Sequence, residues 1–328
     1  MQGWGAGLIG VWVAATAVVA GAAAPASSGP VDGMALLKKV ANASRQVCFS
    51  GTFVYSAGKS AESALIAHCL DAGGEHERVE TLDGPPREVV RRNDQVTSYL
   101  PAIKTIVIEK RKTQRFPLPL PDQLNGIGEH YTISAGALDR VAGYECRWLN
   151  LQPKDALRYG HRFCAELASG LPLTGRMVDA RNEVMEQVAF TQVTIGNTVN
   201  RDLLRSKYQG KAQGWTVDRS TVVEREVGGD TGWTVRDAPS GFRKMSEMRR
   251  LVQSKPTPVA HLLYSDGLAS VSLFIEPVAQ ASSGRGPASQ GNVNVYMHAT
   301  PEYVVTALGK APAETVRRFA ESAVEKSR

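Results

Sequence analysis

The chain has 328 residues, which is enough for two ordinary domains. Hydrophobic residues make up 43% of it and charged residues 21%, which excludes a chain too polar to bury a core. The net charge of +6 weakly favours acidic partners and identifies none of them.

The first 26 residues have the pattern of an export signal. Residues 8–24 are small, apolar and uncharged, and Ala24-Pro25-Ala26 offers an A-x-A cleavage site. No Lys or Arg precedes the apolar segment, so a retained membrane anchor is the alternative. We expect a signal peptide over residues 1–26 and a soluble, exported mature chain.

The sequence has an even number of cysteines, as is common in an oxidising compartment. They are Cys48, Cys69, Cys146 and Cys164. A two-residue turn at Gly58-Lys59 would place the first pair opposite each other, and folding about Pro153–Asp155 would bring the second pair together. This predicts the disulfides Cys48–Cys69 and Cys146–Cys164. Free buried thiols are the alternative.

The segment after the export signal predicts one helix and then an antiparallel meander. Asp32 can cap a helix over 33–44 with one apolar face. Short β-rich stretches separated by turns follow it. They are 48–55, 63–70, 76–82, 87–92, 95–100, 104–109, 140–151, 159–166, 173–179 and 184–195. The proline-rich stretch 115–130 is predicted to be a long loop.

A polar stretch over 201–214 predicts a domain boundary, with one domain over 27–200 and another over 215–328. The second domain is again β-rich and ends in a helix over 313–326. Its predicted strands are 233–235, 259–264, 270–275, 293–297 and 303–308. Residues 280–292 are predicted to be a flexible loop. The expected fold class is therefore mainly β, of the α+β type.

Residues 75–88 gather six acidic or imidazole side chains, as in a metal or acid–base site. Strand alternation divides them between two faces and interleaves them with Arg78, Arg91 and Arg92. Competing guanidinium groups disfavour a metal site, so we predict a structural surface here. No other stretch has a catalytic pattern, and we expect no enzyme, no cofactor and no metal. A catalytic site at 75–88 remains the alternative.

Several long strings together resemble the MucB/RseB family over nearly the whole mature chain. They are FSGTFVY (49–55), HERVETLDGPPREVVRRND (76–94), YLP (99–101), LQPKDALRYGHRF (151–163), GLPL (170–173), SGFRKMSEMRR (240–250) and HLLYSDGLASVSLFIEP (261–277). The resemblance implies a periplasmic negative regulator of the envelope-stress (sigma-E type) response. Such a protein binds the periplasmic domain of the RseA/MucA anti-sigma factor and shields it from regulated proteolysis until lipid or lipopolysaccharide relieves it.

The resemblance also implies a fold and a set of partners. The N-terminal domain would be a half-open antiparallel β-barrel around helices, like LolA and LppX, and would sense lipid. The smaller C-terminal domain would grip the anti-sigma factor. We expect no nucleic acid among the partners, and a homo-oligomer is an open alternative. A periplasmic lipid or lipoprotein carrier of LolA type is the alternative function, although it leaves the second domain unexplained.

Two groups of residues are candidate contacts for these ligands. Phe49, Phe53 and Tyr55 share one strand face and are predicted to contact lipid, with packing on the first helix as the alternative. The basic stretch 236–250 is predicted to bind an acidic partner segment, with a solvated edge strand as the alternative. Its predicted partner-binding residues are Phe242, Arg243, Lys244, Met245, Met248 and Arg249.

Overall fold

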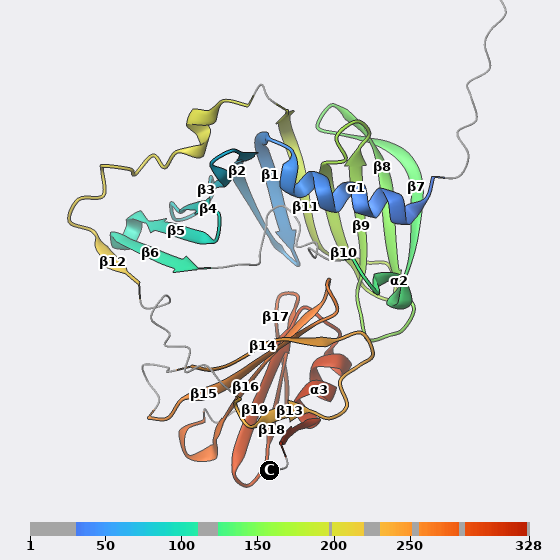
Figure 1. The fold of residues 1–328 in the computed structure, drawn as a ribbon, viewed down its shortest axis with the longest axis vertical. Helices are drawn as coiled ribbons and strands as arrows, with labels where there is room; N and C mark the ends of the chain where they lie inside the picture. Colours follow the sequence, from blue (N-terminus) through green and yellow to red (C-terminus); the bar gives the residue numbers. More distant parts are fainter. Residues whose placement is uncertain are drawn as a thin grey trace, which may run out of the picture. The chain divides into compact units, whose positions relative to one another are not determined.

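Figure 1 shows the chain in a computed structural model. The structure describes residues 31–110, 124–196, 199–219, 230–250, 256–281 and 286–326. The predicted signal peptide lies outside these ranges. Among the described residues, no helix combines the length and the apolar character that a bilayer crossing requires.

The first helix, α1 (Gly33–Gln46), begins where the sequence predicts it. The Asp32 side chain accepts a hydrogen bond from the Met34 backbone N–H at 2.9 Å and caps the helix. Leu37 and Val40 are fully buried and pack on Leu149 and Phe163 of the large sheet. The predicted cap and apolar face are therefore both confirmed.

Twelve strands form one large sheet in the order β12-β6-β5-β4-β3-β2-β1-β11-β10-β9-β8-β7. Their bounds are β1 Phe49–Ala57, β2 Ser60–Asp71, β3 Gly74–Thr81, β4 Glu88–Arg92, β5 Gln95–Leu100, β6 Thr105–Lys110, β7 Tyr131–Val141, β8 Tyr144–Pro153, β9 Gly160–Glu166, β10 Pro172–Val178, β11 Val184–Ile195 and β12 Thr216–Asp218. All neighbours are antiparallel except β12, which runs parallel to β6. Because β12 and β7 are the two ends of the order, the sheet is open, as predicted.

Both predicted disulfides are present. Cys48 is bonded to Cys69 and Cys146 to Cys164, and the described residues contain no free cysteine. The first pair lies at the base of the β1–β2 hairpin, whose turn is Gly58-Lys59 as expected. The second bridges β8 and the adjacent β9.

A smaller sheet lies in the C-terminal part, with the order β14-β15-β16-β19-β18-β17. Its strands are β14 Arg243–Arg250, β15 Val259–Ser265, β16 Ser270–Pro277, β17 Gly286–Gln290, β18 Val293–Ala299 and β19 Tyr303–Gly309. Helix α3 (Ala313–Glu321) packs Val316 and Phe319 into the core of this sheet. The C-terminal part also contains a two-stranded ribbon, which pairs β13 (Trp233–Val235) with β20 (Ala323–Glu325). Short helical turns are α2 (Ile127–His130), η1 (Pro101–Ile103), η2 (Arg201–Leu204) and η3 (Val278–Gln280).

Some predicted elements were wrong. The single strand expected over 140–151 is the β7–β8 hairpin, because Ala142 and Gly143 both adopt positive φ and turn the chain. The loop expected over 280–292 contains β17, which pairs with β18 about a turn at Gly291. The last helix ends at Glu321, and the chain continues as β20. Of the loop expected over 115–130, residues 115–123 lie outside the described residues, and its last four residues form α2.

Candidate functional sites

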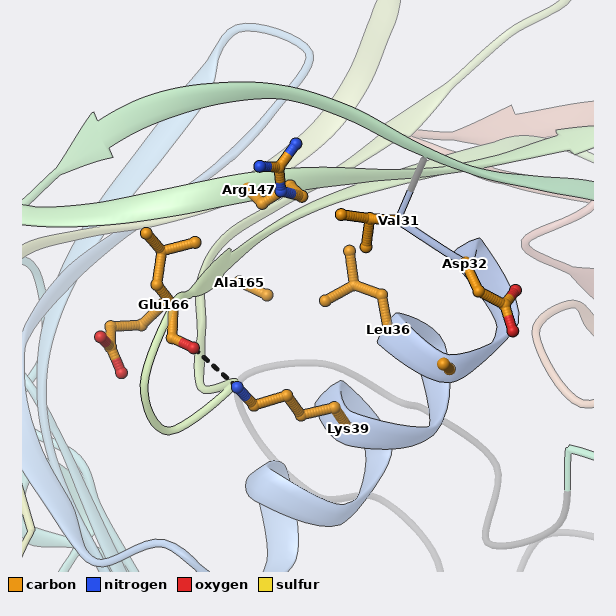
Figure 2. A pocket seen from close by; sticks show the side chains of 9 residues that line it. Val31, Asp32, Leu36, Lys39, Arg147, Ala165 and Glu166 are labelled. Atoms are coloured by element: carbon orange, nitrogen blue, oxygen red, sulfur yellow. Dashed lines mark hydrogen bonds between the residues drawn. The ribbon is translucent and has the colours of Figure 1, made fainter. Parts of the chain in front are cut away.

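A small cavity opens between α1 and the neighbouring sheet (Figure 2). Its volume is about 300 Å³, at the lower end for small-molecule pockets. It is lined by Val31, Asp32, Ala35, Leu36 and Lys39 from α1 and the residues before it, and by Arg147, Ala165, Glu166 and Leu167 from β8, β9 and the following turn. The lining is therefore mainly aliphatic, with charged groups among it.

The charged groups of this cavity are held in place by hydrogen bonds. Lys39 Nζ donates to the Leu167 carbonyl at 2.6 Å, and Arg147 donates to the Gly136 carbonyl at 3.1 Å. Glu166 accepts from the Ser169 hydroxyl and backbone N–H. Burial alone would raise the pKa of Glu166, but these hydrogen bonds outweigh burial and hold the pKa below its usual range. The cavity thus combines an apolar lining with two cations, Lys39 and Arg147, and two carboxylates, Asp32 and Glu166.

The three residues predicted to contact lipid do not line this cavity. Phe49 is fully buried and Phe53 is 3% exposed, and both rings pack edge-on against Phe190. Tyr55 is half-buried beside the same core, where burial and then Glu186 raise its pKa. They contribute to the sheet core, and their role as lipid contacts stays a prediction.

The predicted partner-binding stretch forms β14, at one edge of the smaller sheet. A β-bulge between Lys244 and Ser246 leaves Met245 unpaired, and its side chain is 61% exposed. Arg243 and Lys244 are also exposed. A bulge that turns a large apolar side chain outward beside two cations is suited to a partner contact.

The other predicted partner contacts are less accessible. Phe242 is 7% exposed and packs edge-on against Phe319 at 5.3 Å. Met248 and Arg249 are half-buried, and Arg249 donates to the Thr231 carbonyl at 2.9 Å. Arg243, Lys244 and Met245 are therefore the members of the predicted set that β14 presents to solvent.

Glu247 is the acidic residue of β14, and it pairs with two lysines. Its carboxylate accepts hydrogen bonds from Lys244, Thr231 and Lys326. Burial would raise the pKa of Glu247, but these bonds lower it to about 2. Lys244 is thus paired with Glu247, whereas no ion pair involves Arg243 within the described part of the chain.

The acidic cluster at 75–88 is only partly at the surface: Asp83 is exposed, whereas Glu77 and Glu88 are buried. The described residues contain no group of three metal-ligating side chains. Glu88 is fully buried and accepts from Arg78 Nε at 2.8 Å, and Glu77 and Arg91 are also buried and lie 3.8 Å apart. The predicted surface was wrong for Glu77 and Glu88, because Arg91 and Arg78 pair with these acids and allow both to be buried.

This ionic network also holds the segment that follows the large sheet. Arg78 contacts Glu80, and Lys207 pairs with that same carboxylate. The Lys207 backbone N–H donates to Glu88 at 3.2 Å, and the Tyr208 ring stacks on Tyr99 at 5.7 Å. The predicted linker 201–214 is therefore anchored to β3, β4 and β5. Strand β12, beyond that linker, joins the large sheet, so the predicted domain limits stay a prediction.

Known protein families match both parts of the chain. The MucB/RseB N-terminal domain matches residues 32–208, and the MucB/RseB C-terminal domain matches residues 228–324. The chain belongs to the MucB/RseB family. This confirms the resemblance found in the sequence and places the chain in a family of regulatory binding proteins.

Individual members of the MucB/RseB family match over most of their length. The Sigma factor AlgU regulatory protein MucB of Pseudomonas aeruginosa is 29% identical over 291 residues, which cover 87% of this chain and 89% of MucB. The Sigma-E factor regulatory protein RseB of Salmonella typhimurium is 26% identical over 318 residues, covering 95% and 97%. A solved Pseudomonas aeruginosa MucA/MucB complex aligns with a TM-score of 0.74 at 27% identity, covering 91% of this chain and all of that chain.

Proposed function

We propose that this protein is a periplasmic regulator that binds the periplasmic domain of a MucA/RseA-type anti-sigma factor and shields it from regulated proteolysis. The observation that carries the proposal is the likeness, over both sheets, to MucB solved in complex with MucA. The protein would act by stoichiometric binding rather than by turnover. Lipid or lipopolysaccharide would relieve the shielding.

The exposed part of β14 supports the protein-binding half of the proposal. Arg243, Lys244 and Met245 offer two cations and one soft apolar side chain at a sheet edge, where an acidic amphipathic segment can bind. Their side chains contribute little to the core, so they can be changed without unfolding the domain.

The test is calorimetric binding of the cognate anti-sigma periplasmic domain to residues 27–328. Arg243→Glu with Met245→Glu should weaken binding by about tenfold or more, because one contact reverses its charge and another loses its apolar surface. Lys59→Glu, at the exposed tip of the β1–β2 turn, is the matched control and should bind like the wild type. Equal effects from β14 and from the control would contradict the assignment of β14.

The cavity beside α1 supports the lipid half. Its aliphatic lining suits an acyl chain, and Lys39 and Arg147 lie where they can meet an anionic head group. Ala35→Trp should fill the cavity and abolish binding of a fluorescent fatty acid. Gln46→Trp, at the exposed end of the same helix, should leave it intact. Retained acyl binding in Ala35→Trp would exclude this cavity.

The periplasmic location is supported by the predicted export signal and by the two disulfides, since disulfides persist mainly in oxidising compartments. Cell fractionation tests it, and recovery of the chain with its disulfides in the periplasmic fraction is the expected result. A chain that binds acyl lipid tightly but no anti-sigma factor would instead favour the carrier function.

A further inference from the structure

Arg158 is a buried arginine that reaches from the larger sheet to the smaller one. It lies in the loop between β8 and β9, and its side chain has no exposed surface. Its Nε donates to Asp266 at 2.7 Å, and its two terminal nitrogens donate to Asp155 and to the Ser240 carbonyl. The guanidinium also lies over the Phe242 ring, 5.2 Å from its centroid.

The carboxylate that Arg158 meets is equally buried and fully engaged. Asp266 lies in the turn between β15 and β16, and its Oδ1 accepts from the backbone N–H groups of Leu268 and Ala269. Its Oδ2 accepts from Arg158 and from the Tyr131 hydroxyl at 3.2 Å. Removing Arg158 would leave the Asp266 carboxylate buried without a cation, so this contact is not readily exchanged for solvent.

The segment that enters β14 lies directly on this ion pair. Gly241 has φ +87°, and a Cβ there would come within 2.3 Å of His130 Nε2 and 3.0 Å of Arg158 Nη2. Only a residue without a side chain fits so close to both groups. Residues 240–242 therefore take their position from side chains of the N-terminal part, and β14 begins at the next residue.

The same ion pair adjoins the core beneath the α1 cavity. Leu268, two residues after Asp266, packs on the core cluster that contains Leu37, Val40 and Tyr131. Leu36 belongs to this cluster and also lines the cavity. A continuous set of packed and hydrogen-bonded side chains thus joins the cavity, Arg158 and the start of β14, and it offers a physical route for coupling between the two sites.

We propose that Arg158 is a positioning residue that fixes the partner-binding strand β14 and transmits the effect of acyl binding to it. The proposal rests on the proposed function.

Hydrogen exchange tests the positioning role without any ligand. Arg158→Met should speed exchange at residues 240–246 and 266–269 at least about tenfold while the β1–β2 hairpin keeps its protection, because only the contacts to Arg158 are lost. The double variant Arg158→Met with Asp266→Asn removes the unpaired charge as well, and so gives a readable result if the single variant is poorly folded. Arg162→Met, whose side chain contacts Asn182 in the larger sheet, is the control. Wild-type protection at 240–246 in both Arg158 variants would overturn the proposal.

Binding then tests the coupling. In the wild type, a saturating fatty acid should weaken binding of the anti-sigma domain by about 5-fold or more. In the double variant this factor should fall to about 1, although the fatty acid still binds its cavity. A factor unchanged from the wild type would overturn the coupling. If the wild type binds no anti-sigma domain, the proposed function fails, while the exchange result still decides whether Arg158 positions β14.

Discussion

Glu88 is a carboxylate with no exposed surface, held between Arg78 and the Lys207 backbone. Buried ion pairs contribute little relative to apolar replacements, but removing one partner strands the other charge. Glu77 and Glu88 therefore belong to a buried ionic network that supports the fold. Glu80, in the same stretch, is half-buried and pairs with both Arg78 and Lys207.

Glu88→Gln should lower the free energy of unfolding by about 1–3 kcal/mol, because the Arg78 guanidinium loses its buried carboxylate partner and keeps only Glu80. Glu62→Gln, which changes an exposed acid on β2, should alter it by less than about 0.5 kcal/mol. Urea unfolding of both variants measures the difference. Equal, small effects would mean that the cluster behaves as a solvated surface after all.

Glu247 predicts an acid-sensitive contribution to stability. Its folded pKa of about 2 lies below the ordinary value of 4.5, so the carboxylate stabilises the fold above about pH 4.5. This contribution should be lost as the pH falls from about 4.5 towards 2. Solvent reaches the group, so we expect no more than about 2 kcal/mol. Unfolding measured between pH 2 and 7 should show a smaller acid loss in Glu247→Gln than in the wild type; identical profiles would contradict this.

At the scale of elements, each disulfide closes a short loop within neighbouring strands. Cys146 and Cys164 are separated by 18 residues, and Cys48 and Cys69 by 21. Bridges over loops of this length restrict the unfolded chain and stabilise by roughly 3 kcal/mol each. Replacing either pair by alanines should lower the unfolding free energy by about that amount in denaturant titrations. A pair whose removal costs nothing would show that its bridge does not constrain the unfolded chain.

Elements with strong local patterns were predictable from the sequence. Asp32 and the apolar spacing of Leu37 and Val40 give α1, and strand periodicity with turn residues gives β1 to β6 within a few positions. The β7–β8 turn was missed because Ala142 takes positive φ, which alanine rarely does, so no residue type marks it before Gly143. β17 was missed because its glycine- and serine-rich sequence forms a strand only through pairing with β18.

The candidate sites were less predictable than the elements. The basic and apolar residue types of 236–250 indicated Arg243, Lys244 and Met245, but the burial of Phe242 depends on Phe319, some 80 residues away. Likewise, Phe49 and Phe53 meet Phe190 only after the sheet has formed. The cavity combines a helix with the strands β8 and β9, a juxtaposition that local patterns do not contain.

For the whole molecule, we propose two coupled binding sites: the β14 surface binds an anti-sigma factor, and the cavity beside α1 binds an acyl chain. If the two ligands favour different arrangements of the protein, each must weaken binding of the other by the same factor. A coupling of about 1–3 kcal/mol corresponds to roughly 5–150-fold in affinity, which suffices for a lipid-controlled switch.

The most direct test is calorimetric titration of the cognate anti-sigma periplasmic domain into residues 27–328 at increasing concentrations of acyl lipid or lipopolysaccharide. The account predicts a stoichiometric complex without lipid, and an affinity that falls by about 5-fold or more and then levels off as the lipid saturates. No binding in the absence of lipid would contradict the regulatory function, and an affinity unchanged at saturating lipid would contradict the switch.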